Sequence, residues 1–527
     1  MRHPVRRSLS LITILTLLLT MSALAAPLTL GRGPTSTTVA GIDIDSATIP
    51  ELQALMDGHR LTSVQLTQFY LHRIGKLNPL LNAVITTSPT ALAEARAADQ
   101  ARRQGDDRPL LGIPILVKDN VNTTGMPNTG GSWSLDGSTP ADADIIEQLK
   151  AAGAIIIGKA NLSEWANFRS IPSSSGWSGI GGQTNLAYVL DRNPCGSSSG
   201  SGVGVSASLA VAAVGTETDG SIVCPSGANG IVGIKPTLGL LSGEGIIPIS
   251  SEQDSAGPMA RNVTDAAVLL GAMSVTPTDY TAFLDAGALE GKVIGVWRDG
   301  TYIIEGEVLD ADVAAIMDDT VATLEAAGAT VVEIDVAIED AFGPEFDALL
   351  CEFKADLPAY FETYTGVGYP KTLQDVIDFN NENPELEGPW GSEIFELAEA
   401  TNGRDEACAA IRAEADAIAE AALTDALAGV DAIVAPTNGP AWLTDPVNGD
   451  LSDGSPFIGS STPSAITGWA NITVPAGYVD EHLPIGVSFI GGAFEEPLLI
   501  ALAYAFEQAP ETPVRVPPSF IPTLGGS

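Results

Sequence analysis

The stretch DADIIEQLKAAGAIIIGKAN, residues 142–161, holds the pattern that decides the fold. Its first half spaces apolar residues as a helix does, Gly153 ends that helix, and the apolar run 154–157 predicts a buried strand. The same order of helix, glycine and strand recurs at 313–336 and 413–437. Because helices that alternate with short apolar strands are typical of α/β proteins, we predict one large, mostly parallel or mixed sheet with helices packed on it.

The chain on either side of these units extends the pattern, with one exception. Residues 49–105 have the spacing of successive helices, and residues 483–509 predict one more strand followed by a helix. Residues 352–400, which contain YTGVGYP and NNENPELEGPWG, show no clear period. We expect this region to be irregular and to form an insertion, or lid, over a site.

Residues 1–25 have the three parts of an export signal. A basic start with three arginines precedes an apolar run that is short for a membrane span, and Ala23-Leu24-Ala25 is a small-residue cleavage site. We expect a mature protein that begins near Ala26, forms a single domain over 26–527 and is periplasmic or secreted. No membrane attachment is expected once the signal is removed.

The composition limits the classes of partner. The formal net charge is −40, and 45% of the residues are hydrophobic, which is ample for a sizeable core. Such an acidic surface repels phosphate backbones and anionic lipid, so we expect no nucleic acid as a partner. The same charge also keeps a protein in solution.

The four cysteines do not form a metal-binding pattern. None belongs to a C-x-x-C pair, and no His/Cys cluster has the spacing of a zinc site. Export permits disulfides. We favour a Cys351–Cys408 bond, because both residues fall in helical sequence away from the Gly/Ser-rich centre, but other pairings and free thiols stay open.

Lys118 ends the apolar run of IPILVKDN, residues 113–120. One interpretation is a lysine at a strand end whose ammonium group reaches solvent. The other is a general base, which requires a neutral amine. Since the ordinary lysine pKa is about 10.4, burial would have to lower it by roughly three units.

Two serine-containing segments follow. Residues 193–214 combine a Gly/Ser-rich loop with an apolar run, which predicts a loop that enters a helix, with one of three serines as its cap. The three serines are Ser197, Ser198 and Ser199. The positive end of that helix would help to keep a nearby lysine neutral. In GTETDGSIVCP, residues 215–225, backbone N–H groups of small residues can converge on an oxyanion beside Ser221, although TDGS alone is also an ordinary turn.

A histidine-dependent hydrolase is one alternative. Residues 196–200 match the G-x-S-x-G nucleophile elbow, whose histidine comes later in the chain. His482, in a polar turn-like segment, is the one histidine that follows. A Ser–His hydrolase would therefore have to use His482.

The order of these segments and their amino-acid sequences resemble those of the amidase signature family, whose hallmark is a Ser–cis-Ser–Lys triad. The resemblance is strong over residues 111–273, where it includes GKANLSEWANF, CGSSSGSG, GIVGIKPT and DSAGPMARNVTDAA, and looser up to the C-terminus. The amino-acid sequence of residues 215–225 is most similar to that of bacterial peptide amidases. The fold implied is a twisted mixed sheet with helices on both faces, without a metal or organic cofactor.

The resemblance also implies roles for residues at the matching positions. Ser221 corresponds to the nucleophile, Ser197 to the middle serine that follows a cis peptide bond, and Lys118 to the neutral base that takes the nucleophile's proton through Ser197. The backbone N–H groups of four residues correspond to the oxyanion hole: Thr218, Asp219, Gly220 and Ser221. Ser198 corresponds to a supporting hydrogen-bonding residue.

Two departures from the family concern the substrate. Many members have Gly-Gly before the nucleophile and an arginine two residues after it, whereas this chain has Asp219-Gly220 and Val223. A substrate recognised through an arginine–carboxylate pair at this position is therefore in doubt. We expect a small amide or a short peptide amide as substrate, and a monomer or simple homo-oligomer.

Three further alternatives stay open within the resemblance. The first is an aryl- or fatty-acid-amide hydrolase with the same triad. The second is the amidotransferase subunit that serves glutamyl-tRNA, against which the export signal and the negative charge argue. The third is a non-catalytic binding protein on the same fold, although Lys118, Ser197 and Ser221 are all present.

Overall fold

The computed structural model describes residues 36–298, 311–364, 366–450 and 459–524. Residues 37–527 form one compact unit. The predicted export signal lies outside the described residues. Within these ranges, no helix combines the length and the apolar character needed to cross a bilayer.

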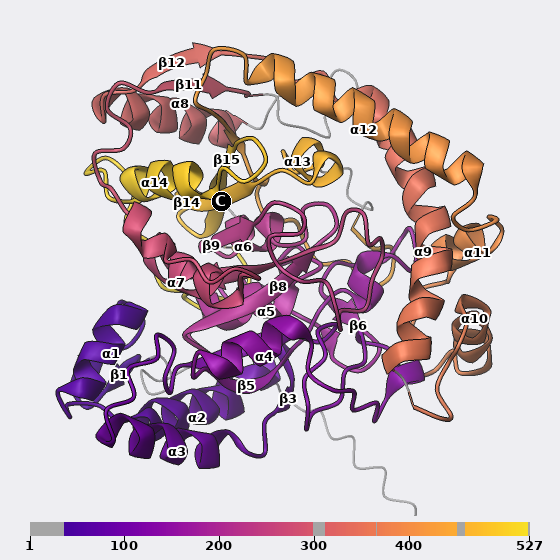
Figure 1. Cartoon of the computed structure of the whole chain (residues 1–527), viewed down its shortest axis with the longest axis horizontal. Helices are drawn as coiled ribbons and strands as arrows, with labels where there is room; N and C mark the ends of the chain where they lie inside the picture. Colours follow the sequence, from indigo (N-terminus) through magenta and orange to yellow (C-terminus); the bar gives the residue numbers. More distant parts are fainter. Residues whose placement is uncertain (1–35, 299–310, 365, 451–458, 525–527) are drawn as a thin grey trace, which may run out of the picture. The chain divides into compact units, whose positions relative to one another are not determined.

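Eleven of the described strands form one mixed sheet, as the sequence predicted (Figure 1). In their order across the sheet they are β12 (Thr330–Glu333), β11 (Val293–Val296), β13 (Ala432–Pro436), β15 (Leu483–Ile490), β14 (Asn471–Val479), β9 (Val232–Lys235), β10 (Ser255–Ala260), β8 (Ala212–Glu217), β4 (Pro114–Lys118), β5 (Ile155–Ala160) and β3 (Val84–Thr87). The pairs β4–β5, β4–β8, β11–β12 and β11–β13 are parallel, and the others are antiparallel. Two small ribbons, β1 (Thr38–Val39) with β2 (Ile42–Asp43) and β6 (Trp177–Ser178) with β7 (Gly182–Gln183), stand apart.

The helices of the described residues lie between and over these strands. They are α1 (Ile49–Asp57), α2 (Ser63–Leu81), α3 (Ala91–Arg103), α4 (Asp144–Ala151), α5 (Ser199–Ser206), α6 (Val223–Ala228), α7 (Val263–Met273), α8 (Ala311–Ala326), α9 (Phe342–Tyr364), α10 (Leu373–Glu382), α11 (Glu393–Glu399), α12 (Glu406–Ala426), α13 (Thr462–Thr467) and α14 (Glu496–Glu507). Each predicted unit of helix, glycine and strand is present, as α4–β5, α8–β12 and α12–β13.

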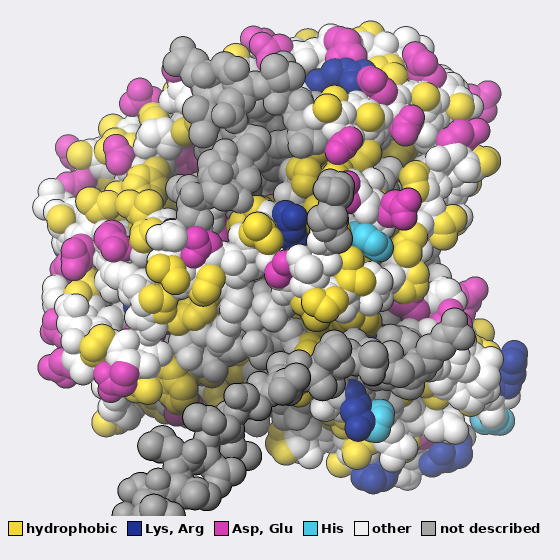
Figure 2. All heavy atoms as spheres, turned by 180° about the vertical axis from the view of Figure 1, so that it is seen from behind, with side chains coloured by type: hydrophobic (Ala, Val, Ile, Leu, Met, Phe, Trp, Pro, Cys, Tyr) yellow, Lys and Arg dark blue, Asp and Glu magenta, His cyan; other side chains and the backbone are white. Residues whose placement is uncertain are grey.

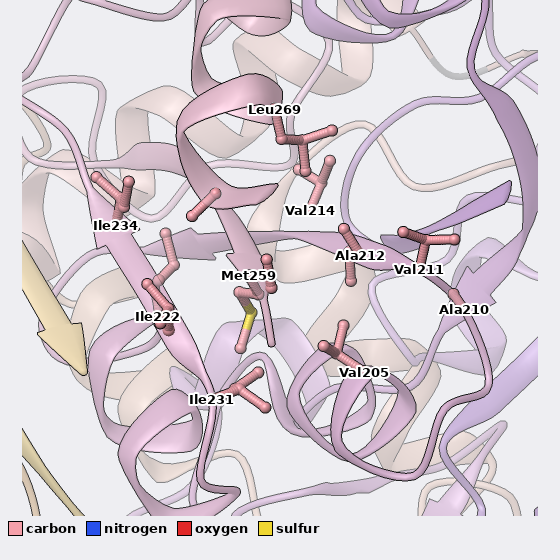
Figure 3. Packing of buried hydrophobic residues seen from close by; sticks show 14 of the residues in the cluster. Val205, Ala210, Val211, Ala212, Val214, Ile222, Ile231, Ile234, Met259 and Leu269 are labelled. Carbon is pink, nitrogen blue, oxygen red and sulfur yellow. The ribbon is translucent and has the colours of Figure 1, made fainter. Parts of the chain in front are cut away.

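The core of the sheet is covered on both faces. Helix α5 packs on β4, β5, β8 and β10, and α7 packs on β8, β9 and β10. Figure 3 shows Val205 of α5 and Leu269 of α7 on opposite sides of the strands that carry Val214 and Met259. All four side chains are fully buried. Burial of apolar surface stabilises a fold by about 25 cal/mol per Å², so helices on both faces stabilise the central strands. Two of these strands, β4 and β8, end at the candidate site.

The expectation of an irregular segment over residues 352–400 is wrong. The segment contains the second half of α9, then α10 and α11, and α10 begins at a capping box formed by Thr372 and Asp375. The glycines and prolines that suggested irregularity lie in the connections between these helices. The helices bury aromatic residues such as Phe353 and Phe395 in a second apolar cluster.

On the face of the molecule shown in Figure 2, acidic side chains are scattered among apolar and uncharged ones, and several Lys and Arg side chains gather at the lower right. With a net charge of −40, a surface on which acidic side chains are dispersed favours solubility over binding of a polyanion.

Candidate active site

Lys118 lies at the end of β4, the third strand from the β3 edge of the sheet, and is fully buried. Its Nζ lies 2.8 Å from Ser197 Oγ, 3.0 Å from the Thr216 carbonyl oxygen and 2.9 Å from Thr216 Oγ1. A neutral amine has two N–H donors and one lone pair. It can donate to the two Thr216 oxygens and accept from the Ser197 hydroxyl. Because an ammonium group could instead donate to all three oxygens, the assignment of a neutral lysine depends on its environment.

The electrostatic environment of Lys118 supports this assignment. Burial lowers the pKa of Lys118 from its ordinary value to about 7, although Asp254 and Glu217 favour the protonated form. The strand end that the sequence predicted is confirmed, whereas the solvent-reaching lysine is not, because none of the side chain is exposed.

Ser197 and Ser198 lie in the loop that enters α5. The Gly196–Ser197 peptide bond is cis, and the Ser197 carbonyl accepts from the Ser163 N–H at 3.0 Å. Ser198 holds the N-cap position, but its side chain makes no cap hydrogen bond. Instead its hydroxyl donates to the Thr216 carbonyl and accepts from the Thr216 N–H. The predicted serine cap is therefore wrong at this position, because pairing with β8 competes for the hydroxyl.

Ser221 lies in the turn that connects β8 to α6. Its side chain lies close to the surface, since the residue is 7% exposed, and its carbonyl accepts from the Ser198 N–H at 3.2 Å. Glu217 fixes the turn because its carboxylate accepts from the N–H groups of Ile222 and Val223 at 2.7 and 2.9 Å. Ser221 is thus held beside the loop that carries Ser197 and Ser198.

The segment before Ser221 is held by side chains on both sides. Asp254 accepts from the Thr218 hydroxyl at 2.5 Å, and Asp219 accepts from the hydroxyls of Ser461 and Thr462. Gly220 has φ +75°, and a Cβ there would lie 3.0 Å from Ser461 Oγ, so the tight turn requires glycine.

The backbone donors of this segment are available. Among the described residues, the N–H groups of Asp219, Gly220 and Ser221 have no protein acceptor. Backbone N–H groups left open next to a candidate nucleophile are the donors that an oxyanion hole requires.

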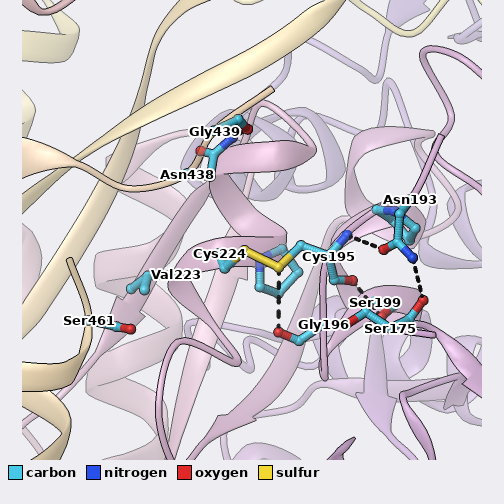
Figure 4. The surroundings of a disulfide bond; sticks show 12 residues. Ser175, Asn193, Cys195, Gly196, Ser199, Val223, Cys224, Asn438, Gly439 and Ser461 are labelled. Atoms are coloured by element: carbon cyan, nitrogen blue, oxygen red, sulfur yellow. Dashed lines mark hydrogen bonds between the residues drawn. A yellow bond between two sulfur atoms is a disulfide. The ribbon is translucent and has the colours of Figure 1, made fainter. Parts of the chain in front are cut away.

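Two disulfides are present. Cys195 and Cys224 join the loop before Ser197 to the helix after Ser221, as Figure 4 shows. Cys351 and Cys408, the pair that the sequence favoured, join α9 to α12. The first bond was not anticipated, because its two segments come close together only when the sheet has formed.

His482 does not belong to this arrangement. It lies in the turn between β14 and β15, where its N–H donates to the Val479 carbonyl at 3.1 Å. The hydroxyls of Ser197, Ser198 and Ser199 contact other groups, namely Lys118, Thr216 and the Cys195 carbonyl. The described residues also contain no group of three or more His, Cys, Asp or Glu side chains arranged to hold a metal ion.

A cavity of about 640 Å³ borders the candidate site. Its lining includes Thr216, which contacts Lys118, and Thr218, together with residues of α9 and of the glycine-rich loop 238–249, but not the three triad candidates themselves. Its volume lies in the usual range for small-molecule sites.

Sequence reasoning missed two groups that complete the site. Thr216 binds Lys118 through two oxygens, and Asn120 donates to Thr216 Oγ1 at 2.9 Å. Both residues lie within the quoted motifs, but a threonine or an asparagine has no distinctive chemistry until its partner is known.

Comparison with known proteins agrees with this geometry. The family model for amidases matches residues 65–500. A probable amidase from Arabidopsis thaliana is 38% identical over 91% of this chain and 92% of its own length. A glutamyl-tRNA(Gln) amidotransferase subunit from Acinetobacter baumannii is 32% identical over 88% of this chain and 96% of its own length.

A solved structure is more similar still. The native peptide amidase of Stenotrophomonas maltophilia is 44% identical, with a TM-score of 0.83 over 90% of this chain and 99% of that one. The chain therefore belongs to the amidase signature family and is an amidohydrolase.

Proposed function

We propose that the protein is an exported peptide amidase, which hydrolyses the C-terminal carboxamide of peptides to a carboxylate and ammonia through an acyl-enzyme on Ser221. The contact between the buried Lys118 amine and Ser197 Oγ, at 2.8 Å, carries the proposal. A buried, neutral lysine that is hydrogen-bonded to a serine hydroxyl can serve as a general base at neutral pH.

The first half of the reaction forms the acyl-enzyme. Ser221 Oγ attacks the amide carbonyl carbon, while its proton passes to Ser197 Oγ and the Ser197 proton passes to Lys118 Nζ. The carbonyl π electrons move to oxygen, and the resulting oxyanion accepts from the backbone N–H groups of Thr218, Asp219, Gly220 and Ser221. When the oxyanion collapses, the C–N bond breaks, and the proton on Lys118 passes through the Ser197 hydroxyl to the leaving nitrogen, which departs as ammonia.

The second half restores the enzyme. A water molecule attacks the Ser221 ester and gives its proton to Lys118 through Ser197. The new tetrahedral intermediate then collapses, Ser221 regains its proton, and the carboxylic acid leaves. Ser198 supports both halves by binding Thr216, which in turn contacts Lys118.

Peptide amides are the substrate class that the similarities favour. A solved structure of a peptide amidase in complex with the competitive inhibitor chymostatin is 44% identical to this chain, with a TM-score of 0.84. The cavity beside Thr216 and Thr218 has room for residues next to the scissile amide. Aryl and fatty-acid amides are the alternative substrates, because they need the same triad.

Ammonia release tests the proposal. Blocked dipeptide amides, simple aryl amides and fatty amides would be compared with the purified mature protein and with Ser221→Ala, Lys118→Ala and His482→Ala variants. We expect the peptide amides to react fastest, loss of Lys118 to cost about 10²–10⁴-fold, and loss of His482 to have no effect.

Other outcomes have distinct meanings. Activity that survives loss of Lys118 but disappears with His482 would overturn the triad. A preference for aryl or fatty amides would keep the triad and replace the substrate. Inactivity on every amide would favour a binding protein.

A further inference from the structure

Gln253 is a fully buried residue that contacts the segment preceding the nucleophile. Its Nε2 donates to the Thr218 carbonyl at 3.1 Å and to Glu345 Oε1 at 2.6 Å. Its Oε1 accepts from Arg412 Nη1 at 2.8 Å. Both ends of the amide are therefore held by hydrogen bonds, which leaves the side chain little freedom to rotate.

The partners of Gln253 come from two helices outside the sheet. Glu345 lies on α9 and Arg412 on α12. Arg412 also binds Glu352 of α9 in a two-pronged pair at 2.8 and 2.6 Å, and Ser250 donates to the same carboxylate at 2.6 Å. Helices α9 and α12 pack against each other, and their courses can be followed in Figure 1.

A disulfide also joins α9 to α12 close to the Arg412–Glu352 pair. Cys351 is the neighbour of Glu352, and Cys408 lies one helical turn before Arg412. Arg412 and Glu352 are 5% and 1% exposed, so their pair is shielded from water and its geometry is well defined. The position of Gln253 is thus set by α9 and α12.

The contact with the Thr218 carbonyl affects catalysis through peptide geometry. The carbonyl of Thr218 and the N–H of Asp219 belong to one planar peptide group, and in a trans peptide they point in opposite directions. Fixing the carbonyl oxygen therefore fixes the direction of the Asp219 N–H, one of the donors assigned above to the oxyanion. The Thr218 hydroxyl is held separately by Asp254, so Gln253 acts specifically on the backbone.

We propose that Gln253 is a positioning residue that aims the Asp219 N–H at the oxyanion, and that Arg412 and Glu352 hold Gln253 in place. This inference rests on the proposed function, since it requires an oxyanion at Ser221. The effect belongs to the transition state, because the oxyanion does not exist in the bound substrate.

Two variants remove the contact while keeping the shape of the side chain. Gln253→Met loses all of its hydrogen bonds. Gln253→Glu keeps an acceptor for Arg412 and, when ionised, cannot donate to the Thr218 carbonyl. Assayed above the pKa of the new carboxyl, it remains informative if the methionine variant does not fold. Loss of an entire oxyanion donor costs about 10²–10³-fold in kcat, so we expect a misaimed one to cost about 10–100-fold, with KM changed less than about threefold.

Arg404→Met is the matched control. Arg404 binds Ser251 and Glu252 in the same turn as Gln253, and Asp356 on α9, but it does not contact Gln253. We expect its kcat to stay within about twofold of the wild-type value. Arg412 acts on Thr218 through Gln253. We therefore expect Arg412→Met to lower kcat, but by less than Gln253→Met does.

A peptide aldehyde provides a readout that a purely structural role would not move. Ser221 Oγ adds to the aldehyde carbon and creates an oxyanion, which mimics the transition state. We expect the inhibition constant of the aldehyde to rise in proportion to the loss of kcat/KM in both Gln253 variants, at equal folded content by circular dichroism and at a temperature well below Tm.

Three results would overturn the inference. They are an unchanged kcat in both Gln253 variants, an aldehyde affinity that does not follow kcat/KM, and an Arg404→Met loss as large as that of Gln253→Met. Full activity of Arg412→Met would overturn the part assigned to α12. Wild-type turnover of peptide amides tests the proposed function separately; if another amide is preferred, the same ratios are measured with that amide.

Discussion

Lys118 shows how one residue depends on its surroundings. It is 0% exposed, and its Nζ makes three polar contacts, at 2.8 to 3.0 Å, with Ser197 Oγ and the two Thr216 oxygens. Burial lowers its pKa to about 7, so the neutral form is well populated at ordinary pH. The same lysine at a solvated strand end would stay protonated and could not act as a base.

The pH profile of kcat/KM tests this property. Because the neutral form of Lys118 is the base and protonation removes it, we expect kcat/KM to fall about tenfold per pH unit below about pH 7. Burial also raises the pKa of Asp254 to about 7, so Asp254→Asn serves as the control: it should keep an acid limb, shifted to lower pH because Asp254 favours the protonated form of Lys118. Full activity maintained down to about pH 5 would contradict a lysine base.

At the scale of elements, the Cys195–Cys224 bond connects the loop that carries Ser197 to α6, the helix that follows Ser221. It closes a loop with a sequence separation of 29. For a loop of that length, the chain-entropy model predicts that the bond raises the free energy of unfolding by about 3–4 kcal/mol. The bond also keeps the entries of α5 and α6 together.

Replacing both cysteines with alanine tests this contribution. We expect the free energy of unfolding of Cys195→Ala/Cys224→Ala, measured by urea denaturation, to fall by about 3–4 kcal/mol. The reductant dithiothreitol should lower the stability of the wild-type protein but leave that of a variant lacking all four cysteines unchanged. Equal stability of the wild-type protein and the Cys195/Cys224 variant would show that packing alone holds the loops.

Several elements were predictable from local sequence, and one region was not. The pattern in residues 142–161 predicted α4 and β5 because one helical period and one glycine stop define them within twenty residues of chain. The helices within 352–400 were missed because they are short, and the prolines and glycines in their connections interrupt the hydrophobic periodicity of a helix. Tertiary packing against Trp165 and its aromatic neighbours supports these helices.

At the scale of the whole molecule, we propose that the protein is exported. Two disulfides suit an oxidising compartment, which agrees with the signal expected over residues 1–25. We expect bacterial expression of the full chain to yield a periplasmic or secreted product that begins near Ala26, as judged by intact mass. Ala25→Phe should block the cleavage, and a cytoplasmic product that retains Met1 would contradict the proposal.

Resemblance to the amidase signature family pointed to the three residues proposed for the triad, and the sequence by itself determined most of the helices and strands and the acidic character of the chain. These properties follow from local periodicity, composition and short motifs. Only the tertiary structure decided which distant groups meet: Lys118 contacts Ser197 across 79 residues, and Arg412 contacts Gln253 across 159. The physical reason is that such contacts form only after the sheet and helices pack, and the same packing removes the water that would otherwise keep Lys118 protonated.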